Sequence, residues 1–193
     1  MSSGRPNPGK PIELLNEQEF REHFFIPNGI CVQLVEEDPT STEKAAHNTI
    51  FFSKEQFNVR LGFPLLSIFK QFLHYTQIPL AHIHSNIVQV LMGWNILNML
   101  FHLDLSLLEV FFVYTIKKGK KDIFSMFAHI PSLKLVTGLP DSNKGGAKGH
   151  VLVRGPWAGL IEHLERDFHP NCSLKIPSRD GFECLSPYYF LLS

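Results

Sequence analysis

Apolar residues recur every three or four positions along residues 85–101, which is the spacing of one face of an α-helix. A short polar break, His102-Leu103-Asp104, separates this stretch from a second apolar pattern that runs from Leu107 to about Tyr114. The two patterns predict a pair of helices at the centre of the fold. The expected core face of the first helix consists of Ile87, Val90, Leu91, Trp94, Leu97, Leu100 and Phe101.

Both helix starts carry capping signals. Ser85 or Asn86 is the expected N-cap of the first helix, because either side chain can accept a hydrogen bond from a free backbone N–H. Ser106, followed three positions later by Glu109, is a capping-box pattern that starts the second helix. The polar break therefore predicts a short connection between two packed helices.

Shorter elements come before this pair. Asn16 begins a capping-box pattern that predicts a helix over residues 16–24. Residues 30–35 and 49–52 are rich in apolar residues and bounded by turn or polar residues, which is typical of short strands. The polar residues between them predict a loop.

Two further helices are expected between these strands and the central pair. Ser53 with Gln56 predicts a short helix that ends near Arg60. Pro64 stands where a helix accepts its first residue, and an apolar face follows it until Pro79 ends the unit. The core is then a set of helices packed antiparallel across short connections.

Beyond Lys121 the pattern changes to the alternation of strands, in residues 124–128, 133–135 and 151–153. These runs predict a small antiparallel sheet or hairpin beside the helices. The expected fold class is α+β, predominantly helical, with an antiparallel helix core and a small antiparallel sheet or hairpin on the C-terminal side.

Composition divides the chain into three parts. Residues 1–15 are rich in Pro and Gly at their start and are expected to be disordered. Residues 16–157 form the expected single helical-rich domain. Residues 158–193 are expected to hold a polar helix and a loosely ordered tail.

The 17 phenylalanines, against four tyrosines and two tryptophans, favour dry aromatic packing over a stacking surface for bases or sugars. Phe111 and Phe112 widen the apolar arc of the second central helix, so we expect it to be covered on more than one side. Cys31 is one of three cysteines, none of them in a CxxC pair, and is expected to be a small buried residue.

The chain has no net charge, because its 18 basic and 18 acidic residues cancel, and therefore no long-range electrostatic field. Asp104 and Glu109 interrupt the apolar stretch, which argues against a membrane span, and the N-terminus lacks the apolar core of a signal peptide. The expected location is therefore intracellular, without membrane contact.

No motif in the sequence indicates a cofactor site or a metal site. His82 and His84 point apart on a helix or turn and have no acidic or cysteine ligand at diagnostic spacing. Residues 142–149 are rich in glycine and lysine but lack the Gly-Lys pair of a phosphate loop. We therefore expect no cofactor and no metal.

Four cations follow the second central helix: Lys117, Lys118, Lys120 and Lys121. Such a cluster can contact a phosphate backbone without reading base sequence. The alternative is a solvated helix end, where the helix dipole favours lysine. Both interpretations remain open at this point.

Residues 51–157 resemble the gypsy-type transposon domain of plant retrotransposon-derived proteins. The resemblance rests on Gly62, Pro64 and Leu65 before a helix, a polar helix start at Ser85-Asn86 where the family has Pro-Asn, and an aromatic strand region that ends near Pro156-Trp157. It implies a structural or nucleic-acid-associated segment of an element's polyprotein, with no catalytic residues to transfer. The departure at the tail implies a truncated copy.

Two classes of function follow. The first is a non-enzymatic, retrotransposon-derived segment that acts by protein association, including self-association, or by weak nucleic-acid contact. The second is an enzyme whose site is assembled from dispersed residues such as His129, Asp141 and His150. The sequence favours the first class.

Overall fold

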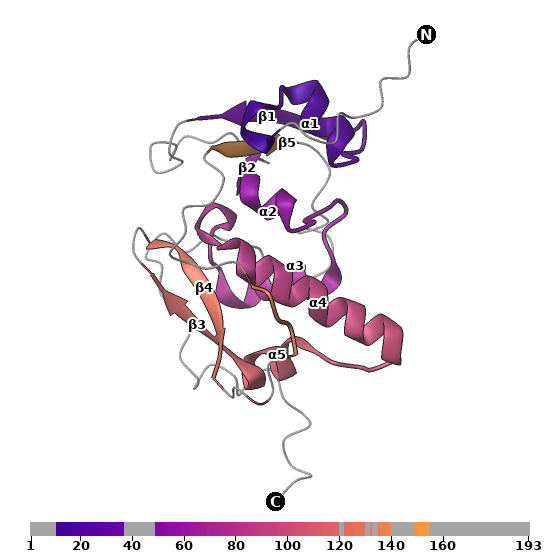
Figure 1. The fold of residues 1–193 in the computed structure, drawn as a ribbon, viewed down its shortest axis with the longest axis vertical. Coiled ribbons are helices and arrows are strands. Elements are labelled where there is room, and N and C mark those ends of the chain that lie inside the picture. The colour runs from indigo at the N-terminus through magenta and orange to yellow at the C-terminus, as the bar shows by residue number, and fades with distance from the viewer. Residues whose placement is uncertain are drawn as a thin grey trace, which may run out of the picture.

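The computed structural model describes residues 11–36, 49–119, 122–129, 132, 135–139 and 149–154. The predicted α+β class is confirmed: helices form the body and small antiparallel sheets lie beside it (Figure 1). The helices are α1 (Glu17–His23), α2 (Lys54–Asn58), α3 (Ser67–Thr76), α4 (Ser85–Phe101) and α5 (Leu107–Val113), with 3-10 turns η1 (Ile12–Leu14) and η3 (Leu80–His82). The strands are β1 (Cys31–Val35), β2 (Thr49–Ser53), β3 (Tyr114–Lys118), β4 (Phe124–Ala128) and β5 (His150–Arg154).

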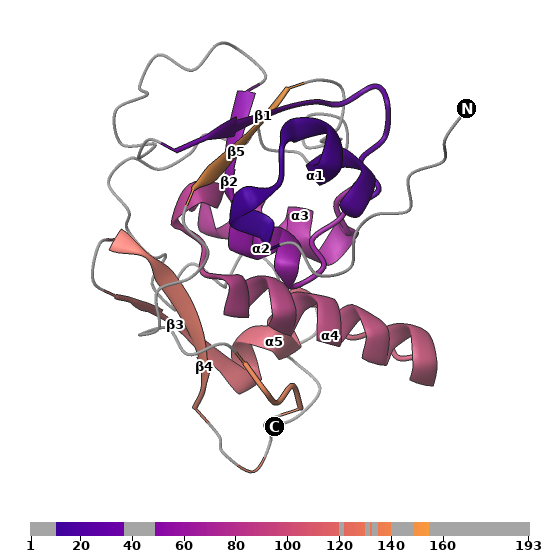
Figure 2. The ribbon, with the colours of Figure 1, turned by 45° about the horizontal axis from the view of Figure 1, so that its top comes forward.

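The first sheet joins the two ends of the described chain. Its strand order is β1-β5-β2, and β5 pairs antiparallel with both neighbours, so that Val153 lies opposite Val32 and Ile50 (Figure 2). The strands predicted over 30–35, 49–52 and 151–153 are thus confirmed. Their arrangement differs from the prediction, because the late strand completes a sheet with the N-terminal strands.

The second sheet is the hairpin of β3 and β4, which pair antiparallel on the C-terminal side of α5. The predicted strand over 124–128 is confirmed, whereas β3 begins at Tyr114, where the sequence suggested the end of a helix. The strand predicted around Leu135 is wrong, since Leu135 lies in no strand and its side chain is exposed. Leu133 lies outside the described residues.

Three capping boxes start helices as predicted. At α1, Asn16 accepts a hydrogen bond from the Glu19 N–H at 2.9 Å and its own N–H donates to the Glu19 carboxylate at 3.0 Å. The boxes of Ser53 and Ser106 start α2 and α5.

The expected disorder of residues 1–15 does not extend to the last five of them. The 3-10 turn η1 spans Ile12–Leu14, and Leu15 packs into the core.

Helix α3 begins later than predicted. Pro64, expected at the first helical position, follows a cis peptide bond, and the helix starts at Ser67 after an extended Leu66. The intervening turn lays the Phe63 ring against Phe52 and Phe57, with ring centroids 5.8 and 6.0 Å apart. The packing of the Phe63 ring therefore stabilises this turn in place of a helix that starts at Pro64.

Residues 80–86, most of them buried, connect α2 and the hairpin to the start of the main helix α4, and we call them the junction segment. On one side, the Gln56 amide of α2 donates to the backbone oxygens of Leu80 and Ile83, at 2.8 and 2.7 Å. On the other side, the His84 N–H donates to the Phe124 oxygen in β4 at 2.9 Å. One short segment therefore links α2 to the hairpin.

Asn86 completes this link and does not act as the helix cap. Its side chain donates to the Met126 oxygen at 3.0 Å and accepts from the Met126 N–H at 3.2 Å, so that it pairs with β4 as a neighbouring strand does. The N-cap of α4 is His84, whose Nδ1 accepts from the Asn86 N–H at 3.1 Å. The predicted cap at Ser85 or Asn86 was wrong, because tertiary pairing engages the Asn86 amide.

Burial along α4 covers only its first two-thirds. Ile87, Val90, Leu91 and Trp94 are buried as predicted, but Leu100 and Phe101, which were predicted to lie in the core, are 67% and 63% exposed. The reason is visible in Figures 1 and 2, where α4 extends past the other labelled elements.

Two further burial predictions were wrong. Phe111 packs against Phe72 and Tyr75 of α3, with ring centroids 6.1 and 5.3 Å apart, but Phe112 is 59% exposed. The second central helix is therefore not covered on the side of Phe112. Cys31 is exposed as well, because it opens an edge strand with its side chain outward.

We expect Asn86→Ala to destabilise the protein by about 2 to 4 kcal/mol, because it leaves the buried N–H and oxygen of Met126 without their hydrogen bonds. Asn58→Ala is the matched control, since Asn58 is exposed at the end of α2 and should change stability by less than about 0.5 kcal/mol. Urea unfolding measures both. Equal stability of the two variants would contradict a junction held by the Asn86 amide.

Candidate functional site

The lysine cluster lies on the hairpin. Lys117 and Lys118 end β3, opposite Ser125 and Phe124 of β4, and both side chains are exposed. The interpretation of a helix end is wrong, because α5 stops at Val113 and strand β3 separates it from the lysines. Lys120 and Lys121 lie outside the described residues.

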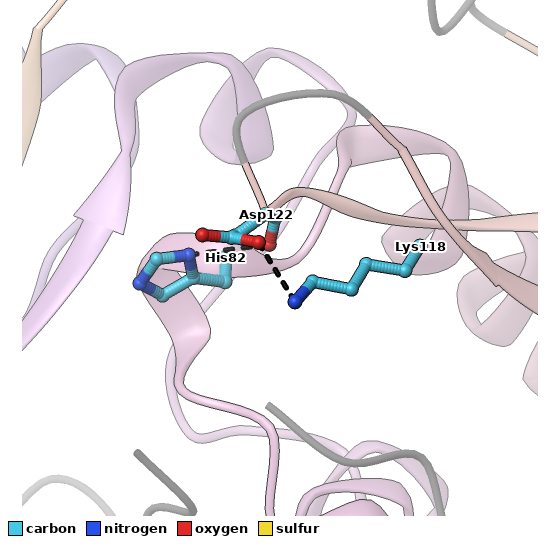
Figure 3. Close-up of polar contacts among 3 residues, drawn as sticks. All are labelled: His82, Lys118 and Asp122. Atoms are coloured by element: carbon cyan, nitrogen blue, oxygen red, sulfur yellow. Dashed lines mark hydrogen bonds and ion pairs between the residues drawn. The ribbon is translucent and has the colours of Figure 1, made fainter. Parts of the chain in front are cut away.

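Lys118 has an acidic partner across the turn of the hairpin. Its Nζ lies 2.7 Å from the Asp122 carboxylate, and the His82 Nδ1 lies 3.3 Å from the Asp122 backbone oxygen (Figure 3). His82 and Lys118 approach Asp122 from opposite sides in this view. The contact joins η3, at the start of the junction segment, to the hairpin.

These neighbours lower the pKa of Asp122. The hydrogen bond from Lys118 is the largest cause, the positive charge of Lys118 is the next, and His82 adds a smaller attraction. All these groups stand at the surface, where such a pair contributes little to stability. Its effect is therefore local to Lys118, Asp122 and His82.

Lys117 rests on an aromatic ring. Its Nζ lies 5.4 Å from the centroid of the Phe127 ring in β4, within the range of a cation–π contact. Successive residues of a strand point to opposite faces, so Lys117 and Lys118 do not share one flat surface. A phosphate that contacts Lys118 has to compete with Asp122.

The two described residues of the enzyme alternative come from separate elements. His129 follows β4, and its N–H donates to the Val113 oxygen at 3.1 Å. His150 opens β5 in the three-stranded sheet, and Asp141 lies outside the described residues. Of the predicted loop 142–149, only Gly149 is described.

The histidines considered for metal binding have structural contacts. His84 caps α4 from a buried position, and His82 faces Asp122 at the surface. In the part of the chain that the structure describes, no group of three or more His, Cys, Asp or Glu residues could hold a metal ion.

The exposed end of α4 is a second candidate site, which the sequence analysis missed. We define the α4 tip by its five exposed apolar residues, which are Ile96, Met99, Leu100, Phe101 and Leu103. The sequence carried a signal: residues 85–101 contain no Asp, Glu, Lys or Arg, so α4 has no charged stripe for solvent. The polar residues near this end of the helix are the uncharged Asn95 and Asn98.

The α4 tip is held rigidly. The Asn98 side chain donates to the Leu105 oxygen at 2.8 Å and accepts from the Leu105 N–H at 3.1 Å, which folds the following loop back onto the helix. His102 ends the helix with a φ of 50°, and its N–H donates to the Asn98 oxygen. A surface that is already ordered loses little conformational entropy on binding.

We expect the pKa of the Asp122 carboxyl to lie below the usual aspartate range in the folded protein, and Lys118→Gln to move it back toward that range. The matched control is Lys117→Gln, which removes the neighbouring cation and should leave the pKa of Asp122 unchanged. NMR titration of the carboxyl carbon measures all three proteins.

The same shift fixes the sign of the pH dependence. Because the pKa of Asp122 is lower in the folded than in the unfolded chain, the pair with Lys118 stabilises the fold above the unfolded pKa and loses this effect as the pH falls through the folded pKa. The stability difference between wild type and Lys118→Gln should therefore shrink in acid. A difference that grows in acid would contradict the pairing.

Among the residues that the structure describes, none of the helices combines the length and the apolarity needed to cross a bilayer. Comparisons with protein-family models, with curated proteins and with solved structures find no match for this chain. Its function has to be argued from the hairpin and the α4 tip themselves.

Proposed function

We propose that this chain is a non-enzymatic, retrotransposon-derived segment that acts by protein association, with the α4 tip as its contact surface. The observation that carries the proposal is the exposed and uncharged end of α4, a helix whose other part is buried in the core. Contiguous apolar surface of this kind marks sites of protein contact.

The size of the surface supports this role. Five apolar side chains that are about half to two-thirds exposed offer roughly 500 Å². At about 25 cal/mol per Å², covering this area is worth on the order of 10 kcal/mol before the entropy cost of association. The binding free energy that remains after this entropy cost is in the range of a reversible contact.

The proposed origin rests on the order of sequence features along residues 51–157, which resembles the gypsy-type transposon domain. In this proposal the chain derives from such a segment and works inside the cell. An enzyme is the alternative, with His129, Asp141 and His150 as its residues. His150 opens β5 in the three-stranded sheet, whereas His129 follows β4 of the hairpin, so the two described histidines come from separate parts of the fold, which favours the non-enzymatic proposal.

The second candidate function is weak nucleic-acid contact through Lys117, Lys118, Lys120 and Lys121. It is favoured by the exposure of Lys117 and Lys118 at the end of the hairpin. The pairing of Lys118 with Asp122 and the zero net charge of the chain limit its strength. Protein association therefore remains the first proposal.

A photo-crosslinking amino acid at position 99 tests the association. Placed on the α4 tip in the full chain, it should form covalent adducts with a protein partner in cell extract, and the matched control at exposed position 58 should not. Adding Leu100→Lys should reduce the adduct at position 99 several-fold, since a charge in an apolar contact has to be desolvated. Equal adducts at positions 99 and 58 would contradict the proposal.

A salt titration tests the nucleic-acid contact. Binding of duplex DNA or RNA should weaken with salt, with a slope of about −0.9 for each phosphate contacted, and Lys117→Gln/Lys118→Gln should reduce that slope. Arg60→Gln/Lys70→Gln is the matched control, because it removes two cations elsewhere and gives the same net charge. Changing Lys120 and Lys121 as well should abolish the binding.

The outcome is decided by the two double variants. If both weaken binding equally, the contact depends on net charge and not on the hairpin. If wild type does not bind at low salt, this second function is excluded.

A further inference from the structure

Strand β3 bonds β4 through every second residue. At one end of this pairing the Gly119 N–H donates to the Ile123 oxygen at 2.8 Å. At the other end the His129 N–H donates to the Val113 oxygen at 3.1 Å. In an antiparallel pair, residues that exchange backbone hydrogen bonds alternate with residues that do not. The odd-numbered residues of β3 therefore bond β4, and the even-numbered residues turn their N–H and C=O groups to the outer edge.

This outer edge of β3 is open. It presents the N–H and the oxygen of Ile116, the N–H of Lys118 and the oxygen of Tyr114, and no described residue bonds these four groups. The hairpin lies at one side of the helices, with β3 as one of its two strands (Figure 1). An open edge of this kind is a template for a further strand.

Two other strand edges in the fold have partners. On the outer edge of β4, the N–H of His84 and the side chain of Asn86 bond the backbone. On β1, the Leu34 N–H donates to the Glu17 carboxylate of α1 at 3.3 Å. The open edge of β3 thus differs from edges that the chain satisfies with its own residues.

Positive charge lies at the end of this open edge. Lys117 and Lys118 are exposed, and Lys120 and Lys121 follow them in the sequence. Lys118 pairs with Asp122, whereas no acidic residue that the structure describes pairs with Lys117. Like charges that lie directly opposite each other destabilise strand pairing, and opposite charges stabilise it. Charge at this edge therefore favours an acidic strand.

We infer that the outer edge of β3 binds an extended acidic peptide segment of a partner protein, which adds to the hairpin as a further strand. In this mode of recognition, main-chain hydrogen bonds give affinity and neighbouring side chains give specificity. The surface is separate from the α4 tip, so the inference goes beyond the association proposed there.

The register of the added strand follows from the edge. A peptide residue opposite Ile116 exchanges two backbone hydrogen bonds with it, and its side chain lies on the same face as the half-buried Ile116 side chain. The next peptide residue lies opposite Lys117, with Cβ atoms about 5 Å apart. The Lys117 ammonium lies on that face, over the Phe127 ring. The fitting segment therefore alternates apolar and acidic residues.

Amide hydrogen exchange of the full chain, followed by NMR, tests the edge. In the free protein, the N–H groups of Ile116 and Lys118 should exchange at least about tenfold faster than those of Thr115 and Lys117, because only the latter bond β4. The probe is the end-blocked peptide Thr-Glu-Val-Glu-Val-Glu-Thr. At saturation it should slow exchange at Ile116 and Lys118 at least about tenfold and leave Thr115 and Lys117 unchanged.

Two peptide controls separate the backbone from the charge. A peptide with Gln in place of every Glu keeps the backbone donors and acceptors, and it should bind at least about fivefold more weakly. A peptide with N-methyl groups on the residues that face the edge keeps the charge but loses its donors, and it should not bind.

Lys117→Gln is the matching change in the protein. It should weaken binding of the Glu peptide and leave binding of the Gln peptide unchanged, because the ion pair is absent from the second complex. Arg60→Gln is the control, since Arg60 is an exposed cation outside the hairpin, and it should bind both peptides like wild type.

Four outcomes overturn the inference. They are slow exchange at Ile116 and Lys118 in the free protein, no binding of the Glu peptide at about 1 mM, equal binding of the N-methyl peptide, and equal effects of Lys117→Gln and Arg60→Gln. Duplex DNA is the competing ligand. If it shifts the Lys117 resonances without slowing exchange at Ile116, and the Glu peptide does not bind, the lysines contact phosphate and the edge of β3 does not bind a peptide.

Discussion

The structure depends on the junction segment, residues 80–86, whose backbone polar groups are buried between α2 and the hairpin. Two carboxamides hold the segment in place: Gln56 donates to the backbone oxygens of Leu80 and Ile83, and the Asn86 side chain pairs with the backbone N–H and oxygen of Met126 in β4. A buried backbone N–H or C=O without a hydrogen-bond partner lowers the stability of the fold by about as much as several ordinary surface contacts raise it. These bonds therefore fix where α4 begins, and with it the direction in which the helix leaves the body.

Local signals in the sequence were sufficient for the parts of the fold that local forces decide. The boxes at Asn16, Ser53 and Ser106 started helices as predicted, because each is closed by residues three positions apart. The place of β5 between β1 and β2 could not be predicted in this way. It joins residues more than a hundred positions apart, and alternation identifies a strand without identifying its neighbours.

The site was harder to predict than the fold, for a related reason. Periodicity assigned Leu100 and Phe101 to the core because it reports a helical face and not how far the body extends beneath that face. The sequence alone identified the lysine cluster, but it did not predict the residues that surround it. A strand after Val113, an acid at Asp122 and a ring at Phe127 give the two described cations local partners that a helix end would not have supplied.

The junction segment also explains how the two candidate sites can coexist. It fastens the hairpin to the first turn of α4, whereas the apolar tip lies at the last turn, so one rigid helix of 17 residues separates them by about 25 Å. Screening at physiological salt acts over about 8 Å, so the lysines neither repel nor attract a partner at the tip. The proposed protein association at one end of α4 and the proposed phosphate contact at the other are therefore independent, and loss of either by mutation should leave the other unchanged.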